Sequence, residues 1–228
     1  MEQIADDVHL IALAPRYGIN AYLVGDVLVD SGVKGSAKKI LAELDAARVS
    51  LAAHVITHAH VDHVGATPKI VDATGVPVCV GALDRAAAET GDPPVAAALD
   101  KPGLRTVAGF LGSFDGFVVD ATIGEGDDIG YGFTVLDTPG HSAGHVAFWR
   151  ESDRVLICGD VFNTMNLVTT RPGLQQPPSI FTPDPRRNRE SERRLADLEP
   201  RIVLAGHGPP LRNAAAALRS FVAALPAD

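Results

Sequence analysis

The segment 57–65 limits the fold more than any other part of the chain. It places four side chains that commonly bind metal ions, His58, His60, Asp62 and His63, within six residues. Residues two apart point the same way in an extended segment, so His58 and His60 can face one point together. The alternative is a polar turn whose histidines only satisfy backbone groups. A lone histidine would favour that alternative, but this cluster, in a chain with 8 histidines, predicts a metal site.

Composition narrows the class of protein. The chain has 228 residues, 46% of them hydrophobic, and we expect residues 1–228 to form a single domain. The formal net charge of −8 argues against a nucleic-acid partner, which would need a clustered basic surface.

The sequence also indicates a compartment. No stretch approaches the ~20 uninterrupted apolar residues of a membrane-spanning helix. Residues 1–7 are acidic, where a signal peptide would be basic. Cys79 and Cys158 lie in apolar segments, which predicts reduced, buried thiols rather than a disulfide framework. We therefore expect a cytoplasmic protein with no membrane partner.

The order of predicted elements changes along the chain. The first half alternates strands (8–13, 20–24, 27–30, 76–80) with helices (36–48, 67–74, 83–89). The second half contains strands joined by short turns, typical of an antiparallel sheet (133–136, 145–149, 154–158). A polar helix after Asp184, a strand at 202–205 and a final helix after Asn213 complete the chain.

Two segments are harder to assign. Residues 92–116 are rich in glycine and proline, so irregular structure is expected there. Residues 161–183 read as a long loop with four prolines, and a loop of that length inside a domain is usually functional. Either segment could form a flap over the metal site, and the sequence leaves the choice open.

Three more polar residues stand where an apolar strand gives way to a glycine-flanked turn. They are His141, Asp160 and His207. Strand ends are positions from which functional groups converge on a rigid scaffold. With the four residues of the central segment they make seven ligands, enough for two metal ions once water is added.

In this combination the chain resembles the metallo-β-lactamase superfamily. The shared features are the His-x-His-x-Asp-His spacing, a later histidine, an aspartate after a glycine, and a late Gly-His. The resemblance implies an α+β fold, a four-layer αβ/βα sandwich of two mixed β-sheets flanked by helices. It also implies His58, His60 and His141 as ligands of a first metal, Asp62, His63 and His207 as ligands of a second, and Asp160 as the bridge.

The implied chemistry is metal-dependent hydrolysis. Imidazoles and carboxylates suit zinc, which we favour, and also iron or manganese. Two divalent ions can share a hydroxide that attacks the carbonyl of an ester, thioester or lactone. Asp62 can bind metal and orient the nucleophile or carry its proton. Asp30 resembles the aspartate that supports the ligand loop in this family.

The other histidines are weaker candidates. His54 and His9 are expected to be structural. His145 lies four residues after His141, and a supporting role at the metal site is left open for it.

The resemblance does not select one activity. Asp160 is unlike the true β-lactamases, which lack that carboxylate. Only about twenty residues follow His207, where glyoxalase II carries a helical domain, and no tyrosine lies between Asp160 and His207, where lactonases place one. We predict a generic hydrolase of a small-molecule substrate, as a monomer or homodimer. The alternatives are a mononuclear-iron sulfur dioxygenase of the persulfide dioxygenase type and a non-catalytic metal-binding protein.

Overall fold

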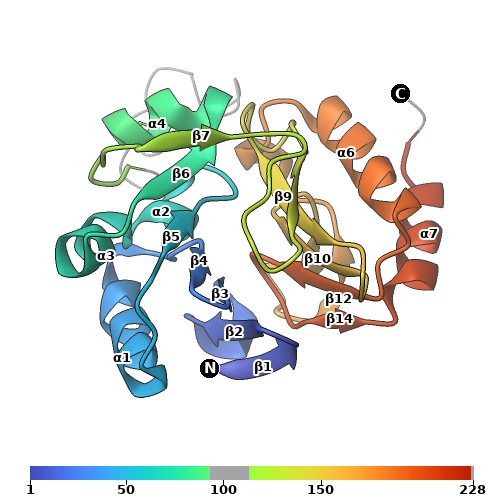
Figure 1. Ribbon diagram of the computed structural model, residues 1–228. Helices are drawn as coiled ribbons and strands as arrows, with labels where there is room; N and C mark the ends of the chain where they lie inside the picture. The colour runs from blue at the N-terminus through green and yellow to red at the C-terminus, as the bar shows by residue number, and fades with distance from the viewer. Residues whose placement is uncertain (93–112, 227–228) are drawn as a thin grey trace.

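Two mixed β-sheets pack face to face, and helices cover the outer face of each (Figure 1). The computed structural model describes residues 1–92 and 113–226. In Figure 1 the N-terminal half, coloured blue to green, carries α1, α3 and α4 on its outside, and the yellow-to-red half carries α6 and α7. This is the predicted α+β, four-layer αβ/βα arrangement.

The first sheet contains seven strands of the described chain, in chain order. They are β1 (Glu2–Ala5), β2 (Val8–Ala12), β3 (Asn20–Val24), β4 (Val27–Val29), β5 (Ala53–Val55), β6 (Val78–Gly81) and β7 (Ala121–Ile123). The pairs from β1 to β4 are antiparallel, and those from β4 to β7 are parallel. Strand β5, which leads into the histidine-rich segment, therefore lies in the parallel part of the sheet.

The second sheet contains five strands in the order β14-β13-β10-β9-β8. They are β8 (Thr134–Asp137), β9 (Val146–Arg150), β10 (Val155–Gly159), β13 (Ile202–Ala205) and β14 (Leu211–Arg212). As predicted, β8, β9 and β10 form an antiparallel meander, whereas β13 runs parallel to β10. It follows that β8, β10 and β13 all run in one direction and end at the same edge.

The helices follow the expected order. They are α1 (Ala37–Ala47), α2 (Val61–Val64), α3 (Thr67–Thr74), α4 (Arg85–Thr90), α6 (Pro185–Asp197) and α7 (Ala214–Ala223). Short 3-10 turns stand at η1 (Pro15–Tyr17), η2 (Lys34–Ser36), η3 (Ala82–Asp84) and η4 (Ser179–Phe181). The carboxylate of Asp184 accepts a hydrogen bond from Arg187 N at the start of α6, a regular N-cap. None of the described helices combines the length and apolar character needed to cross a bilayer.

Alternation along the strands explains the layers. Successive side chains of a strand point to opposite faces, so each strand divides its apolar residues between two cores. On β10, Val155 and Ile157 face the core between the sheets, while Leu156 and Cys158 face α6 and α7. The first sheet behaves likewise, with its outward residues packed against α1 and α3. Both sheets are thus buried on two sides.

The structure differs from the sequence predictions in several places. The N-terminal strand β1 was not predicted. The segment expected as one long loop, 161–183, contains a two-stranded sheet of β11 (Asn163–Met165) and β12 (Pro172–Gln175), followed by η4. Its strands have only three and four residues, so local pattern does not reveal them. The prediction for 92–116 lies mostly outside the described residues. Both cysteines are free as expected, but Cys79 is only half-buried.

Helix α6 carries a buried carboxylate against the second sheet. Glu192 is 0% exposed and accepts hydrogen bonds from Asn188 Nδ2 (3.1 Å) and Gln176 Nε2 (3.1 Å). Burial raises the pKa of Glu192 to about 8, although nearby arginines and these hydrogen bonds oppose the shift.

This shift predicts a pH dependence of stability. Above about pH 4.3 the unfolded chain loses the Glu192 proton, whereas the folded chain keeps it up to about pH 8. The folded state then binds more protons than the unfolded state, so its stability falls as pH rises through this window. We expect the melting temperature of Glu192→Gln, relative to the wild type, to rise from about pH 5 to about pH 8.5. Glu190→Gln, at an exposed glutamate of the same helix, is the control. A flat difference for Glu192→Gln would contradict the assignment.

Candidate metal centre

All seven predicted ligands come together at the edge where the two sheets meet. Their ligand atoms form three overlapping groups, within each of which the atoms lie within 4.8 Å of one another. The groups are His58, His60 and His141; His58, His63 and Asp160; and Asp62, His63 and His207. Each side chain sits just after the C-terminal end of β5, β8, β10 or β13, as the strand-end argument predicts.

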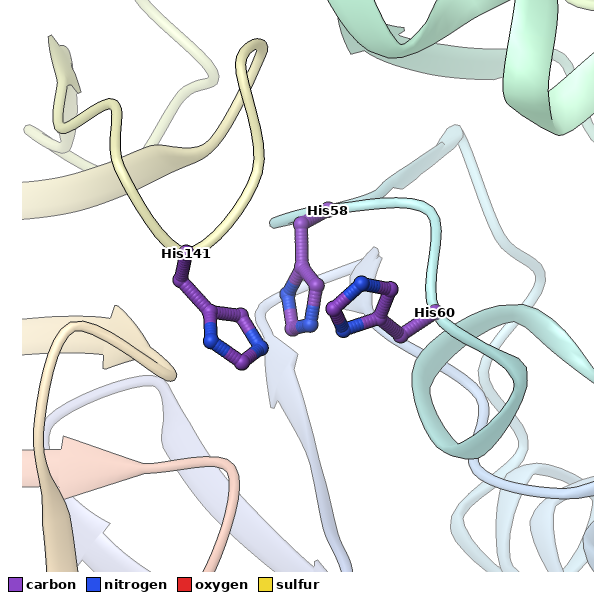
Figure 2. A group of neighbouring side chains, drawn as sticks. All are labelled: His58, His60 and His141. Carbon is purple, nitrogen blue, oxygen red and sulfur yellow. The ribbon is translucent and has the colours of Figure 1, made fainter. Parts of the chain in front are cut away.

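The first group is a triangle of histidine rings. The ring centroids of His58, His60 and His141 lie 4.6, 4.7 and 4.6 Å apart, and each pair of rings is close to perpendicular, at 77–81°. Figure 2 shows that His58 and His60 belong to one chain segment and His141 to another, with the three rings turned toward a common space. Such a triangle presents three nitrogen donors to one ion.

Asp160 connects this triangle to the second group. Its Oδ2 lies 3.7 Å from His141 Nε2 and 3.1 Å from His207 Nε2, and its Oδ1 lies 3.5 Å from His63 Nε2. Asp62 Oδ2 lies 3.3 Å from His207 Nε2. One carboxylate therefore contacts histidines of both groups, which is the position expected for a bridge.

Hydrogen bonds at Nδ1 orient four of the five histidine rings. His63 Nδ1 donates to Asp30 Oδ2 (2.8 Å), and His207 Nδ1 donates to the carbonyl oxygen of Gly18 (2.6 Å). His58 Nδ1 contacts Thr57 Oγ1 (3.0 Å), and His141 Nδ1 contacts Thr182 Oγ1 (3.1 Å).

Both threonine hydroxyls already donate elsewhere, to Asp30 and to the Pro178 carbonyl. The two threonines must therefore accept from the histidines. The proton of each neutral ring then sits on Nδ1, and the lone pair of Nε2 points into the site.

Several inward-facing atoms lack partners, and they indicate whether the site fits a metal ion. Among the described residues, His58 Nε2, His63 Nε2, His141 Nε2 and Asp160 Oδ1 are buried without a hydrogen-bond partner. Buried polar atoms are rarely left unpaired, and a group that stays so calls for an explanation such as an ion. Oriented imidazole nitrogens and carboxylate oxygens are donors that divalent transition metals accept. The residues fit a metal ion.

The electrostatics divide the site into two parts. Burial lowers the pKa of His58 and of His141, so these rings are neutral donors. Burial also opposes protonation of His63 and His207, but nearby carboxylates outweigh it. They raise the pKa of His63 to about 10 and that of His207 well above its usual range. The second group thus attracts positive charge, whether protons or a metal ion.

Asp30 supports the ligand segment, as predicted. It is buried just after β4, and it accepts from Thr57 N (2.8 Å), Thr57 Oγ1 (2.8 Å) and His63 Nδ1 (2.8 Å). Its φ of 58° is uncommon for a residue other than glycine, and aspartate and asparagine tolerate it best. One carboxylate thereby fixes both ends of the segment 57–63.

Two further histidines, His54 and His145, have different roles. His54 is buried and contacts the Leu28 carbonyl and Thr67 Oγ1, which is a structural role. His145 takes the supporting role that was left open. Its Nε2 accepts from Asp160 N (3.1 Å), its Nδ1 contacts Thr138 Oγ1 (2.9 Å), and its ring stacks on His58. Burial lowers the pKa of His145 to about 3, so the ring is neutral.

Sequence analysis missed several contacts of the site. Asp84 bonds to both ligand segments, Thr182 orients His141, and the Gly18 carbonyl orients His207. Asp84 follows the predicted strand at 76–80, so the strand-end argument used for Asp160 could have identified it. Thr182 and Gly18 lie in loops, and no local pattern marks them.

Comparison with known proteins settles the family. A family model described as the metallo-beta-lactamase superfamily matches residues 14–207. The chain belongs to the metallo-β-lactamase superfamily.

Named relatives fall within this superfamily. "Probable metallo-hydrolase YflN" of Bacillus subtilis (strain 168) is 32% identical over 203 residues, 81% of this chain and 76% of the relative. "Hydroxyacylglutathione hydrolase" of Methylobacterium sp. (strain 4-46) is 30% identical over 193 residues, 83% of this chain. The aligned region spans 60% of the length of that second relative.

Solved structures share the fold across nearly the whole chain. TTHA1623 in a di-iron-bound form superposes with a TM-score of 0.69 at 31% identity, covering 92% of this chain and 96% of that one. The B3 metallo-β-lactamase BLEG-1 gives a TM-score of 0.67 at 26% identity, covering 91% and 95%. The family and the fold predicted from the sequence are confirmed.

The role of Asp30 can be tested with the variant Asp30→Asn, because asparagine tolerates the same backbone conformation. The variant removes an acceptor from Thr57 or His63, so His63 should be held less firmly. Loss of such a supporting partner typically weakens metal affinity by roughly 10–100-fold. We expect a weakening of this size when the metal-free protein is titrated with Zn²⁺ against a chromophoric chelator. Asp26→Asn, in the turn between β3 and β4, should bind as the wild type does. Equal affinities for Asp30→Asn and the wild type would disprove the role.

Proposed function

We propose that the protein is a two-metal hydrolase that cleaves an ester, thioester or lactone bond of a small molecule. The observation that carries the proposal is the position of Asp160, which contacts histidines of both ligand groups. The names of the relatives support hydrolysis, and hydroxyacylglutathione is itself a thioester. Because the second relative is aligned over only 60% of its length, glutathione is not carried over as the substrate.

The seven residues would act as metal ligands, and one of them, Asp62, would also take part in the reaction. His58, His60 and His141 would hold one ion, Asp62, His63 and His207 the other, and Asp160 would contact both. When bound, two divalent ions supply a lowered pKa for water and a positive charge that polarises a carbonyl oxygen. Zinc is our preferred metal, with iron or manganese compatible with the same donors.

Asp62 is the residue we assign to proton handling. Its side chain is 33% exposed, whereas those of His207 and Asp160 are each 6% exposed. It is therefore the carboxylate that an incoming water molecule and substrate can reach. It would orient the attacking water toward the carbonyl carbon and accept its proton.

Other parts of the chain would shape the substrate site. Thr182 links His141 to the segment 176–184, so the half-exposed Ile180 and Phe181 stand next to a residue that contacts the metal group. We infer that this segment contributes apolar contacts to the substrate. A monomeric or homodimeric state stays a prediction.

Metal content is the first test of the proposal. Protein purified without added metal should contain about two divalent ions per chain, in line with the two-metal sites of other hydrolases. Removing them with a chelator should abolish hydrolysis of a panel of esters, thioesters and lactones, and restoring Zn²⁺ should recover it. Close to one iron per chain, with oxygen uptake on persulfides, would replace the hydrolase by the sulfur dioxygenase alternative. Metal binding without turnover would indicate the non-catalytic alternative.

Asp62→Asn tests the proton-handling role. Loss of a positioned acid or base typically costs about 10²–10⁴-fold in rate. We expect kcat to fall by at least about 10²-fold, with little change in KM, in protein whose metal content has been brought to the wild-type value. Asp120→Asn is the control, because Asp120 bonds to Val78 at the N-terminal end of β6, whereas the ligand residues follow the C-terminal ends of the strands. A fully metal-loaded Asp62→Asn with wild-type kcat would refute the assignment.

A further inference from the structure

A buried carboxylate outside the seven ligands contacts the site from the 3-10 turn that follows β6. Asp84 lies at the end of η3 and is 0% exposed. Its Oδ2 accepts hydrogen bonds from Ala59 N (3.0 Å) and Ser142 Oγ (2.5 Å), and its Oδ1 accepts from Gly144 N (2.7 Å). Both carboxylate oxygens are therefore occupied by donors.

These donors belong to the two segments that carry the histidine triangle. Ala59 stands between His58 and His60, and Ser142 directly follows His141. Figure 2 shows these segments approaching each other from different parts of the fold, with the rings between them. One carboxylate thus bonds to the backbone of the first segment and to the backbone and a side chain of the second.

Close backbone packing holds the segment after His141 against the turn that carries Asp84. A Cβ atom added at Gly81 would lie 1.9 Å from the Gly144 carbonyl oxygen, and one added at Gly144 would lie 2.4 Å from Asp84 N. Backbone meets backbone here, and only glycine permits that approach. The segment after His141 is thus held against the turn after β6, and the hydrogen bond from Ala59 N to Asp84 joins the other ligand segment to the same turn.

Two simpler roles do not account for Asp84. It occupies the N-cap position of α4, yet its side chain makes no capping hydrogen bond to that helix. It also belongs to none of the ligand groups found among the described residues. The carboxylate serves the two ligand segments instead.

We propose that Asp84 is a positioning residue that fixes the spacing of His58 and His60 relative to His141, and so sets the affinity of the first metal position. The inference rests on the proposed two-metal function. The second position depends on other supports, since Asp30 holds His63 and the Gly18 carbonyl holds His207. Loss of Asp84 should therefore weaken one metal-binding step and leave the other nearly unchanged.

The experiment compares metal binding in the wild type and four variants, all prepared free of metal. Asp84→Asn replaces one acceptor oxygen by a donor that faces other donors. Ser142→Ala removes a single hydrogen bond to Asp84 and is the milder variant. His141→Ala identifies the binding step that belongs to the triangle. Asp120→Asn is the control, because Asp120 also accepts a backbone N–H, that of Val78, but lies at the N-terminal end of β6, opposite the end that leads to Asp84.

Each protein is titrated with Co²⁺, and its absorption spectrum and the two dissociation constants are recorded. The step lost in His141→Ala should weaken roughly 10–100-fold in Asp84→Asn, the range found for groups that orient metal ligands. Ser142→Ala should weaken the same step to a smaller extent, and the other step should stay within the error of the wild type. Thermal unfolding of the metal-free proteins checks that each variant is folded.

Several outcomes overturn the inference. Equal weakening of both steps would mean that Asp84 only stabilises the fold. If Asp84→Asn does not fold, Ser142→Ala decides, and a wild-type first step in that variant refutes the role. If both binding steps are unchanged in Asp84→Asn and in Ser142→Ala, and the wild type binds two ions, this inference is refuted and the proposed function is not. A wild type that binds no metal, or a single ion, refutes the proposed function and this inference with it.

Discussion

The metal centre depends on the packing of one sheet against the other. Neither half of the chain supplies the whole histidine triangle. His58 and His60 come after β5 of the first sheet, whereas His141 comes after β8 of the second. What joins the halves is the apolar core between the sheets, to which strands of both contribute alternate residues such as Val29 and Ile157. Each fully buried aliphatic side chain of this kind contributes about 1.5–3 kcal/mol. The positions of the ligands are therefore a consequence of hydrophobic burial remote from them.

That packing also places polar atoms where water does not reach. A buried polar atom without a partner costs about 1–3 kcal/mol, and several inward-facing atoms of the site are in this situation. The carboxylates in the site attract protons to His63 and His207, as the raised pKa values show. A divalent ion would displace those protons and bind the buried atoms that lack hydrogen-bond partners. Metal binding, proton release and stability are therefore linked in this fold.

The seven residues that the sequence predicts as ligands lie together in the structure, and the signals that pointed to them are local. The spacing within 57–65 and the strand-end positions of His141, Asp160 and His207 can be read without knowing what packs against what. Strand bounds were accurate where a continuous apolar run ends at a glycine, as at 20–24 and 202–205. The strands β11 and β12 were missed because they are short and pair only with each other. Thr182 was missed because its partner, 41 residues away, is set by tertiary structure alone. The single domain over 1–228 stays a prediction.

The order of strands in the first sheet explains why the supporting carboxylates stand where they do. Strand β5 delivers the ligand segment, and its neighbours on either side are β4 and β6, both parallel to it. Parallel strands end at the same edge, so the residues after β4 and β6 flank the loop after β5. Asp30 follows β4 and bonds to Thr57, 27 residues later, while Asp84 follows β6 and bonds to Ala59, 25 residues earlier. Two aspartates, distant in sequence on opposite sides, thus hold one loop from both flanks. Asp30 bonds to His63 of the second group and to Thr57, whose hydroxyl contacts His58 of the triangle. Asp84 bonds to Ala59 and to the segment after His141, which both belong to the triangle. Both ligand groups therefore depend on carboxylates that follow the two neighbours of β5 in one sheet.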